Sequence, residues 1–299
     1  MTAKAPAILW RPEVLERVRA LQLRARAAAA GLGVGLRRSI RVGQAVEFAD
    51  YKPYMPGDSL RDLDWRVLAR RDRLVVRRYR AETEMGATLV LDASADLGST
   101  PAKWEQALGL LATVAWVLHL ENEPVGLTVV AGEGMAVPVL RARRGRGQLA
   151  RIFATLASVQ PAGRAGLREA LSQVGARAHR RGLVVVVGDF MESPETWTPA
   201  LDALVRRRAD VRAAQVYDRD EIGLAFAQPL RLYSPEGGSD EALDPVAMRA
   251  GVREEATRFF GEVRGALRNR RGVHVLAEAH ADLTDLVAAV LAGREAGQP

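Results

Sequence analysis

The sequence contains no cysteine, which excludes disulfide bonds, thiolate catalysis and cysteine-ligated zinc sites. Neither the G-x-S-x-G elbow of α/β-hydrolases nor the G-x-x-x-x-G-K-[ST] phosphate-binding loop occurs. The histidines are few and far apart, and they show no metal-ligand spacing: His119, His179, His274 and His280. None of the enzyme classes that depend on these features is therefore indicated.

Long apolar segments are also missing. The most apolar helix candidate, residues 107–118, is followed by His119 and Glu121. A helix needs about 20 apolar residues to span a bilayer, so this segment is too short. The first eleven residues are mixed in character and do not resemble a signal peptide. We therefore expect a soluble, cytoplasmic protein.

Lysine is scarce, since only three occur and 40 of the 43 basic residues are arginine. The net charge of +7 is concentrated between Arg37 and Arg80, where twelve basic residues face six acidic ones. Such a patch suits nucleic acid or an acidic partner. Because the carboxylates are interleaved with the arginines, we favour internal pairing or protein binding over nucleic acid.

What the sequence has in abundance is an alternation of apolar strands and helices. Within 299 residues, 48% of them hydrophobic, this predicts one large α/β core, a mostly parallel sheet with helices on both faces. Strands are expected at residues 86–92, 125–131, 183–189, 211–217 and 273–277, with a short edge hairpin at 135–140. Helices are expected at residues 12–30, 103–121, 147–159, 167–180, 197–208, 245–270 and 283–291.

The chain divides into three parts by these patterns. Residues 1–35 form a helix and a glycine hinge, residues 36–85 an arginine-rich elaboration, and residues 86–295 the α/β domain. The glycines at 31–35 follow a helix rather than a strand, so they fail the context of a dinucleotide-binding loop.

A dense polar block precedes the α/β domain at residues 54–65. Pro56 and Gly57 signal a turn, and three aspartates then alternate with arginine around Trp65. The block is a poor helix and a poor strand, so we interpret it as a fixed ionic corner. Its arginines predict low carboxylate pKa values and argue against a catalytic role.

Two aspartates, Asp92 and Asp189, come directly after apolar strands. Ligands of open parallel sheets bind at the carboxyl ends of the strands, so these side chains meet if their strands are neighbours. Ser94 and Asp96 add a hydroxyl and a third carboxylate, a set of oxygen ligands that suits Mg²⁺. Alternatively, both aspartates simply cap the helices that follow.

The order of the polar block and the strand-end aspartates along the chain is similar to that in the family known as domain of unknown function 58, which carries a von Willebrand factor A-like domain. The resemblance covers residues 35–277 and is strongest in one block. That signature comprises Pro56, Gly57, Asp58, Arg61, Asp64, Trp65 and Arg70, and the strand ends at Asp92-x-Ser94 and Gly188-Asp189-Phe190 continue it.

This resemblance implies a non-enzymatic interaction or scaffold protein that works with a MoxR-type AAA ATPase on a client complex. It also implies a metal-ion-dependent adhesion site, of which Asp92, Ser94 and Asp189 match three of about five positions. Asp96 replaces a serine, and the threonine expected near Ala165 is absent. We therefore expect a degenerate site with weak or no Mg²⁺ binding.

We expect the signature block to lock the N-terminal segment against the A-like domain, with Asp58, Arg61, Asp64 and Arg70 as its charges and Trp65 as its buried anchor. A nucleic-acid-associated protein that binds through residues 37–80 is the alternative function. A metal-dependent hydrolase at Asp92, Asp96 and Asp189 is a more distant one.

Overall fold

The structure is a computed structural model of the chain. It describes residues 12–32, 47–56, 63–80, 86–130, 139–164, 166–178, 180–223, 230–232, 241–243 and 245–296. Among these residues, no helix combines the length and the apolar character needed to cross a membrane. The fold expected from the sequence, α/β with a mostly parallel sheet, is confirmed.

The central sheet has six strands in the order β10-β7-β6-β3-β4-β5. Their bounds are β3 Ala87–Asp92, β4 Val125–Val130, β5 Val139–Arg143, β6 Leu183–Gly188, β7 Asp210–Tyr217 and β10 Val273–Glu278. All neighbours pair in parallel except β5, which runs antiparallel to β4 at the edge. Strand β6 is a run of valines, since both faces of a central parallel strand are covered.

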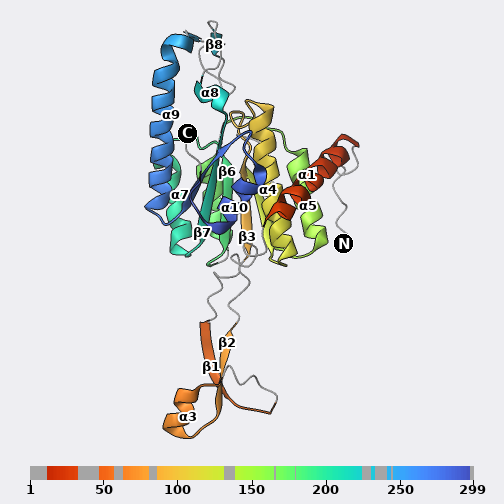
Figure 1. The fold of residues 1–299 in the computed structure, drawn as a ribbon, viewed down its shortest axis with the longest axis vertical. Helices are drawn as coiled ribbons and strands as arrows, with labels where there is room; N and C mark the ends of the chain where they lie inside the picture. The colour runs from red at the N-terminus through yellow and green to blue at the C-terminus, as the bar shows by residue number, and fades with distance from the viewer. Residues whose placement is uncertain are drawn as a thin grey trace.

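Helices cover both faces of this sheet (Figure 1). One face packs against α1 Pro12–Gly31, α4 Pro101–Leu120, α5 Arg146–Ser158 and α10 Leu283–Ala292. The other face packs against α6 Leu167–Arg177, α7 Pro194–Arg206 and α9 Pro245–Arg268. Helix α4 begins at Pro101 because Thr100 accepts a hydrogen bond from the Lys103 amide at 3.3 Å, which caps the first turn.

Helix α1 belongs to the core of the α/β domain. Its buried alanines, Ala25, Ala28 and Ala29, share one apolar cluster with α4, α5 and α10. The Arg24 guanidinium donates to the carbonyl of Glu105 at 3.0 Å and to the Gln106 side chain at 2.9 Å, both on α4. The boundaries predicted at residues 35 and 85 lie outside the described residues and stay predictions.

A separate hairpin precedes the sheet along the chain. Strands β1 Glu47–Pro53 and β2 Val75–Arg80 pair antiparallel, and the seven-residue helix α3 Trp65–Arg71 lies between them in sequence. We call β1, α3 and β2 the hairpin module; Figure 1 draws it well away from the six-stranded sheet. The sequence did not predict these elements, which lie within residues 36–85.

The structure corrects two expectations for the signature block. First, Trp65 begins a helix, because Asp64 accepts hydrogen bonds from the Arg66 and Val67 amides at 3.0 and 3.3 Å. Second, Trp65 is 63% exposed, so it is not a buried anchor. The buried residue is its neighbour Asp64, which also accepts a hydrogen bond from the Tyr51 hydroxyl at 3.0 Å.

The other signature residues are only partly described. Arg70 is exposed on α3, whereas Asp58 and Arg61 lie outside the described residues. The expected role of this block in locking the N-terminal segment against the α/β domain stays a prediction.

Most other elements agree with the sequence to within a few residues at each end. The predicted edge hairpin at residues 135–140 is shifted, since β5 begins at Val139 and residues 131–138 lie outside the description. Three short elements after β7 were not predicted: α8 Arg219–Gly223 and the paired strands β8 Leu230–Leu232 and β9 Glu241–Leu243.

Candidate binding site at the carboxyl edge of the sheet

Asp92 and Asp189 meet at one edge of the sheet, as the sequence predicted for the case that their strands are neighbours. Strands β3 and β6 are parallel neighbours, and Leu91 pairs with Val187 just before the two aspartates. Both carboxylates are buried, with exposed fractions of 1% and 3%. Gly188 makes this approach possible, because a Cβ there would lie 2.7 Å from the Asp92 Cβ.

The Asp92 carboxyl is only half satisfied. Its Oδ1 accepts a hydrogen bond from the Ser94 amide at 3.0 Å, and Oδ2 has no hydrogen-bond partner in the described part of the chain. Burial raises the pKa of Asp92 well above its usual value, and the nearby charges of Asp189 and Glu192 raise it further. The buried pair therefore favours either a bound proton or a cation.

The loop after β6 is held in an unusual conformation. Phe190 is a buried, non-glycine residue with φ of +57°, in the left-handed region that L-residues seldom adopt. Its ring packs edge-on against Trp197, 5.8 Å between centroids, and Asp189 Oδ1 accepts a hydrogen bond from the Met191 amide at 3.2 Å. Backbone strain that is held in place by packing is common at binding sites.

Gln215 and His274 form a buried polar pair that contacts the backbone of Asp189. Gln215 donates its amide N–H to the Asp189 carbonyl at 2.8 Å, so its side-chain oxygen faces His274 Nε2 at 3.0 Å. Nε2 must then carry the ring proton. Burial, and secondarily the charge of Arg264, lowers the pKa of His274 to about 4, so the ring is neutral near pH 7. His274 therefore has a structural role in this buried network.

Asp96 belongs to a different charge cluster. Burial raises its pKa, the charge of Lys103 opposes this, and Glu221 reinforces it. The Lys103 ammonium donates to the Asp96 carbonyl at 2.9 Å and to Glu221 at 3.0 Å. No three acidic side chains in the described part of the chain are placed to hold a metal together, so Asp96 does not complete a site with Asp92 and Asp189.

The residues at this edge fit a magnesium ion incompletely. Asp92, Ser94 and Asp189 provide oxygen atoms from two strand ends, whereas Mg²⁺ takes about six ligands in octahedral geometry. No group of three histidines, aspartates or glutamates among the described residues is placed to hold a metal. Residue 165, where the resemblance expects a threonine, lies outside them.

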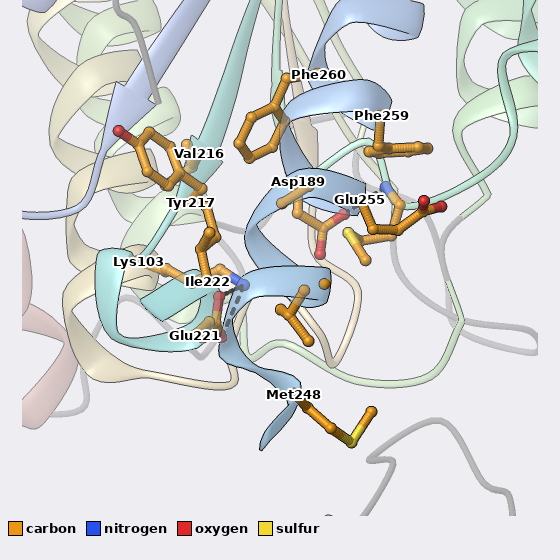
Figure 2. Close-up of a pocket in the computed structure, with 14 residues that line it drawn as sticks. Lys103, Asp189, Val216, Tyr217, Glu221, Ile222, Met248, Glu255, Phe259 and Phe260 are labelled. Carbon is orange, nitrogen blue, oxygen red and sulfur yellow. Dashed lines mark hydrogen bonds and ion pairs between the residues drawn. The ribbon is translucent and has the colours of Figure 1, made fainter. Parts of the chain in front are cut away.

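An apolar cavity of about 720 Å³ opens beside Asp189. Figure 2 shows the Asp189 carboxylate between the Lys103–Glu221 ion pair and Phe259. The walls come from the ends of β6 and β7, from α8 and from α9. The lining residues are Lys103, Asp189, Met191, Val216, Tyr217, Glu221, Ile222, Met248, Gly251, Val252, Glu255, Ala256, Phe259 and Phe260.

Sequence reasoning did not find this cavity or the polar groups around the aspartates. Glutamine within the apolar strand 211–217 was a usable signal, since Gln215 has to find a buried partner. The cavity itself depends on where α9 returns against the sheet, which no local pattern encodes.

The chain is similar to proteins from mycobacteria over most of its length. It is 27% identical to "Uncharacterized protein Mb1516" of Mycobacterium bovis and to "Uncharacterized protein Rv1480" of Mycobacterium tuberculosis, in each case over 282 residues, 89% of this chain and 88% of the relative.

Similar solved structures include von Willebrand factor A domains. One is the von Willebrand factor type A protein from Catenulispora acidiphila, with a TM-score of 0.44, 14% identity, and coverage of 74% of this chain and 44% of that one. BatB from Bacteroides thetaiotaomicron has a TM-score of 0.43, 15% identity, and coverage of 69% of this chain and 97% of that one.

The family model described as "Protein of unknown function DUF58" matches residues 50–260, which include the hairpin module from Asp50 onward, both aspartates and most of α9. The match covers more than half of the chain. The protein therefore belongs to the DUF58 family.

Proposed function

We propose that this protein is a non-enzymatic interaction or scaffold protein that binds partners at the carboxyl edge of its sheet. The observation that carries the proposal is the buried Asp92–Asp189 pair beside an open apolar cavity. Such a combination of a few placed polar groups and an apolar hollow is typical of binding sites. The α/β fold and family membership are consistent with this role.

We further propose that the partner is a MoxR-type AAA ATPase, that the two act together on a client complex, and that they do so in the cytoplasm. This part of the proposal rests on the family resemblance of the signature residues. The ATPase would supply the energy of nucleotide hydrolysis, and this chain would supply the docking surface.

The hydrolase alternative is less well supported. It would require Asp92, Asp96 and Asp189 to share a metal ion, but Asp96 lies beside the Lys103–Glu221 ion pair, and the Lys103 ammonium donates to the Asp96 carbonyl at 2.9 Å. The described residues also lack a group of three acidic or histidine side chains suited to a metal.

The magnesium site is proposed to be degenerate, with weak or no Mg²⁺ binding. Isothermal calorimetry of Mg²⁺ into the full chain is expected to show no saturable heat at micromolar concentrations. Micromolar affinity that disappears in Asp92→Ala would contradict this proposal. Asp72→Asn, an exposed change on the hairpin module, is the matched control.

The partner is tested by affinity capture from the native cell lysate, followed by mass spectrometry. A MoxR-type ATPase is expected to be recovered both at 50 and at 200 mM salt, because a shape-specific protein contact tolerates that change. Uncoupled resin and nuclease-treated lysate are the controls. Recovery of DNA or RNA alone would overturn the proposal.

Nucleic-acid binding remains the second candidate, because α3 exposes three arginines, Arg66, Arg70 and Arg71. Binding to phosphates would weaken steeply between 50 and 200 mM salt as counterions are released. Arg71→Glu would reduce such binding, whereas Glu105→Gln, an exposed change on α4, would leave it unchanged.

A further inference from the structure

A second cavity, of about 330 Å³, lies between the last turns of α6 and the strands β3, β4 and β5. It reaches a strand that is expected to be closed, because β3 is paired on both sides and helices cover both faces of the sheet. Of the six residues of β3, Thr88 alone is not buried. Thr88 lies four residues before Asp92, about 13 Å away at roughly 3.3 Å per strand residue. This cavity is therefore separate from the candidate site at the carboxyl edge.

The floor of this cavity carries two hydroxyl groups, on strands that are otherwise almost entirely apolar. Thr88 on β3 pairs with Gly126 on β4, so Thr88 and Thr128 lie on the same face of the sheet. Thr128 is only 4% exposed. Neither hydroxyl has a hydrogen-bond partner in the described part of the chain. Buried polar groups are normally hydrogen-bonded, so these two are available to a molecule inside the cavity.

The rim of the cavity is basic. Among the described residues that line it, the charged ones are Arg141 on β5 and Arg177 on α6, and both are exposed. Neither guanidinium forms an ion pair or a hydrogen bond with a described residue, and the same holds for the side-chain amide of Gln173. Every charged group of this lining is therefore a cation without a counter-ion in the described chain, an arrangement that suits an anion.

The end of α6 does not oppose an anion here. Free carbonyl groups at a helix C-terminus carry partial negative charge and would repel one. The Arg207 guanidinium donates to two of these carbonyls, those of Ala176 at 3.2 Å and Ala178 at 2.9 Å. Because Arg207 offsets the charge of the helix end, the positive charge of Arg177 stays available to a ligand.

We propose that this cavity binds a small phosphate ester whose organic part carries hydroxyl groups, the chemistry of a sugar phosphate. The phosphate lies between Arg141 and Arg177, and the ligand hydroxyls reach Thr88, Thr128 and Gln173. A phosphate monoester carries a charge of about −1.5 to −2 near pH 7, which matches two guanidinium groups better than a single carboxylate does. The volume is near the lower end of the range for ligand pockets, about 300–1,000 Å³, so the ligand is small. This site goes beyond the proposed interaction function and does not depend on it.

The direct test is isothermal calorimetry of the full-length protein with ribose 5-phosphate, glucose 6-phosphate and glycerol 3-phosphate. EDTA removes metal ions from the candidate site, and salt at about 150 mM screens weak contacts with the basic surface. Inorganic phosphate and the unphosphorylated ribose, glucose and glycerol are the comparison ligands. At least one ester is expected to bind saturably and at least tenfold more tightly than inorganic phosphate, whereas the unphosphorylated compounds should not bind.

Variants locate the binding. Arg177→Gln is expected to weaken the ester at least tenfold, since it removes a charge-assisted hydrogen-bond donor from an exposed position. Arg168→Gln, an exposed change on the same helix outside this lining, is the matched control and leaves the affinity unchanged. Thr128→Val keeps the shape of the side chain and removes its hydroxyl, so it should weaken the ester about threefold or more and leave inorganic phosphate unaffected. Thermal unfolding of Thr128→Val checks that this buried change leaves the protein folded.

Three results would overturn the proposal of a phosphate-ester site. The first is no saturable binding of any of the three esters. The second is binding that Arg177→Gln and Arg168→Gln weaken equally or not at all, because the anion would then lie elsewhere on the basic surface. The third is an ester that binds no more tightly than inorganic phosphate, because the interior of the cavity would then contribute nothing. None of these results bears on the capture of a partner protein, so the proposed interaction function is tested separately.

Discussion

Replacing Asp92 by asparagine is expected to stabilise the protein near neutral pH. Asparagine keeps an oxygen that can accept the Ser94 amide at the position of Oδ1. Its amide nitrogen replaces Oδ2, the atom with no hydrogen-bond partner in the described chain, and can donate toward Asp189. The substitution removes a buried charge without removing the hydrogen bond that orients the loop.

The magnitude follows from the cost of burying a poorly satisfied polar group, about 1–3 kcal/mol. For a domain of this size, each kcal/mol shifts the melting temperature by about 2–4 °C, so Asp92→Asn is expected to melt roughly 2–12 °C higher at about pH 8. The pH dependence has a definite sign. Because folding raises the pKa of Asp92, the folded state binds more protons than the unfolded one, and wild-type stability falls as pH rises from the unfolded pKa toward the folded pKa.

The assay is thermal unfolding by circular dichroism in EDTA at about pH 5 and about pH 8, with Asp72→Asn as the exposed control for the same chemical change. The gain of Asp92→Asn over wild type should be larger at the higher pH, and the control should show no such difference. An Asp92→Asn protein that is less stable than wild type at pH 8, or equally stabilised at both pH values, would refute the reasoning. A parallel scan with millimolar Mg²⁺ shows whether a cation relieves the same repulsion in the wild type.

Two further substitutions test how the site and the hairpin module are built. Gly188→Ala is expected to lower the free energy of unfolding in urea by about 1–3 kcal/mol, because the added Cβ would lie 2.7 Å from that of Asp92. Gly261→Ala on α9 is the control: a Cβ there meets nothing within 4 Å, so the change should be neutral or stabilising. Equal losses in both variants would contradict the close-approach argument. Asp64→Ala removes the N-cap of α3 at a cost of about 1 kcal/mol. Amide exchange in Trp65–Arg71 should therefore accelerate while the sheet stays protected, and unchanged exchange in α3 would show that the cap is dispensable.

The sheet and the meeting of the two aspartates were predictable because both depend on local patterns and one topological rule. A run of valines such as 184–187 marks a central strand, and the residues that follow parallel strands must share one edge. Helix α3 was missed although its signal is present. Asp64 is a favourable N-cap and the residues after it form helices readily, but the surrounding charges suggested irregular structure.

The exposure of Trp65 and the existence of the cavity beside Asp189 could not be predicted from local patterns. Both depend on which surfaces meet in three dimensions, and a large aromatic residue is equally compatible with a core and with an exposed contact surface. The separation of Asp96 from the aspartate pair has a similar origin. It follows from the position of Lys103 one helical turn into α4 and of Glu221 on α8, far away in sequence.

The packing of α1 has a consequence for how the chain can be shortened. Helix α1 packs in the α/β domain, the hairpin module follows it in sequence, and the domain resumes at β3. The first helix is therefore joined to the sheet through a long connecting segment that contains the hairpin module. A chain cut within that segment would keep α1 in place as a non-covalent component, since Ala25, Ala28 and Ala29 remain inside the shared core. A protein that began at β3 would instead expose the apolar surfaces of α4 and α5 as one contiguous apolar patch. We expect such a protein to aggregate, which would make it unsuitable for studying the binding site.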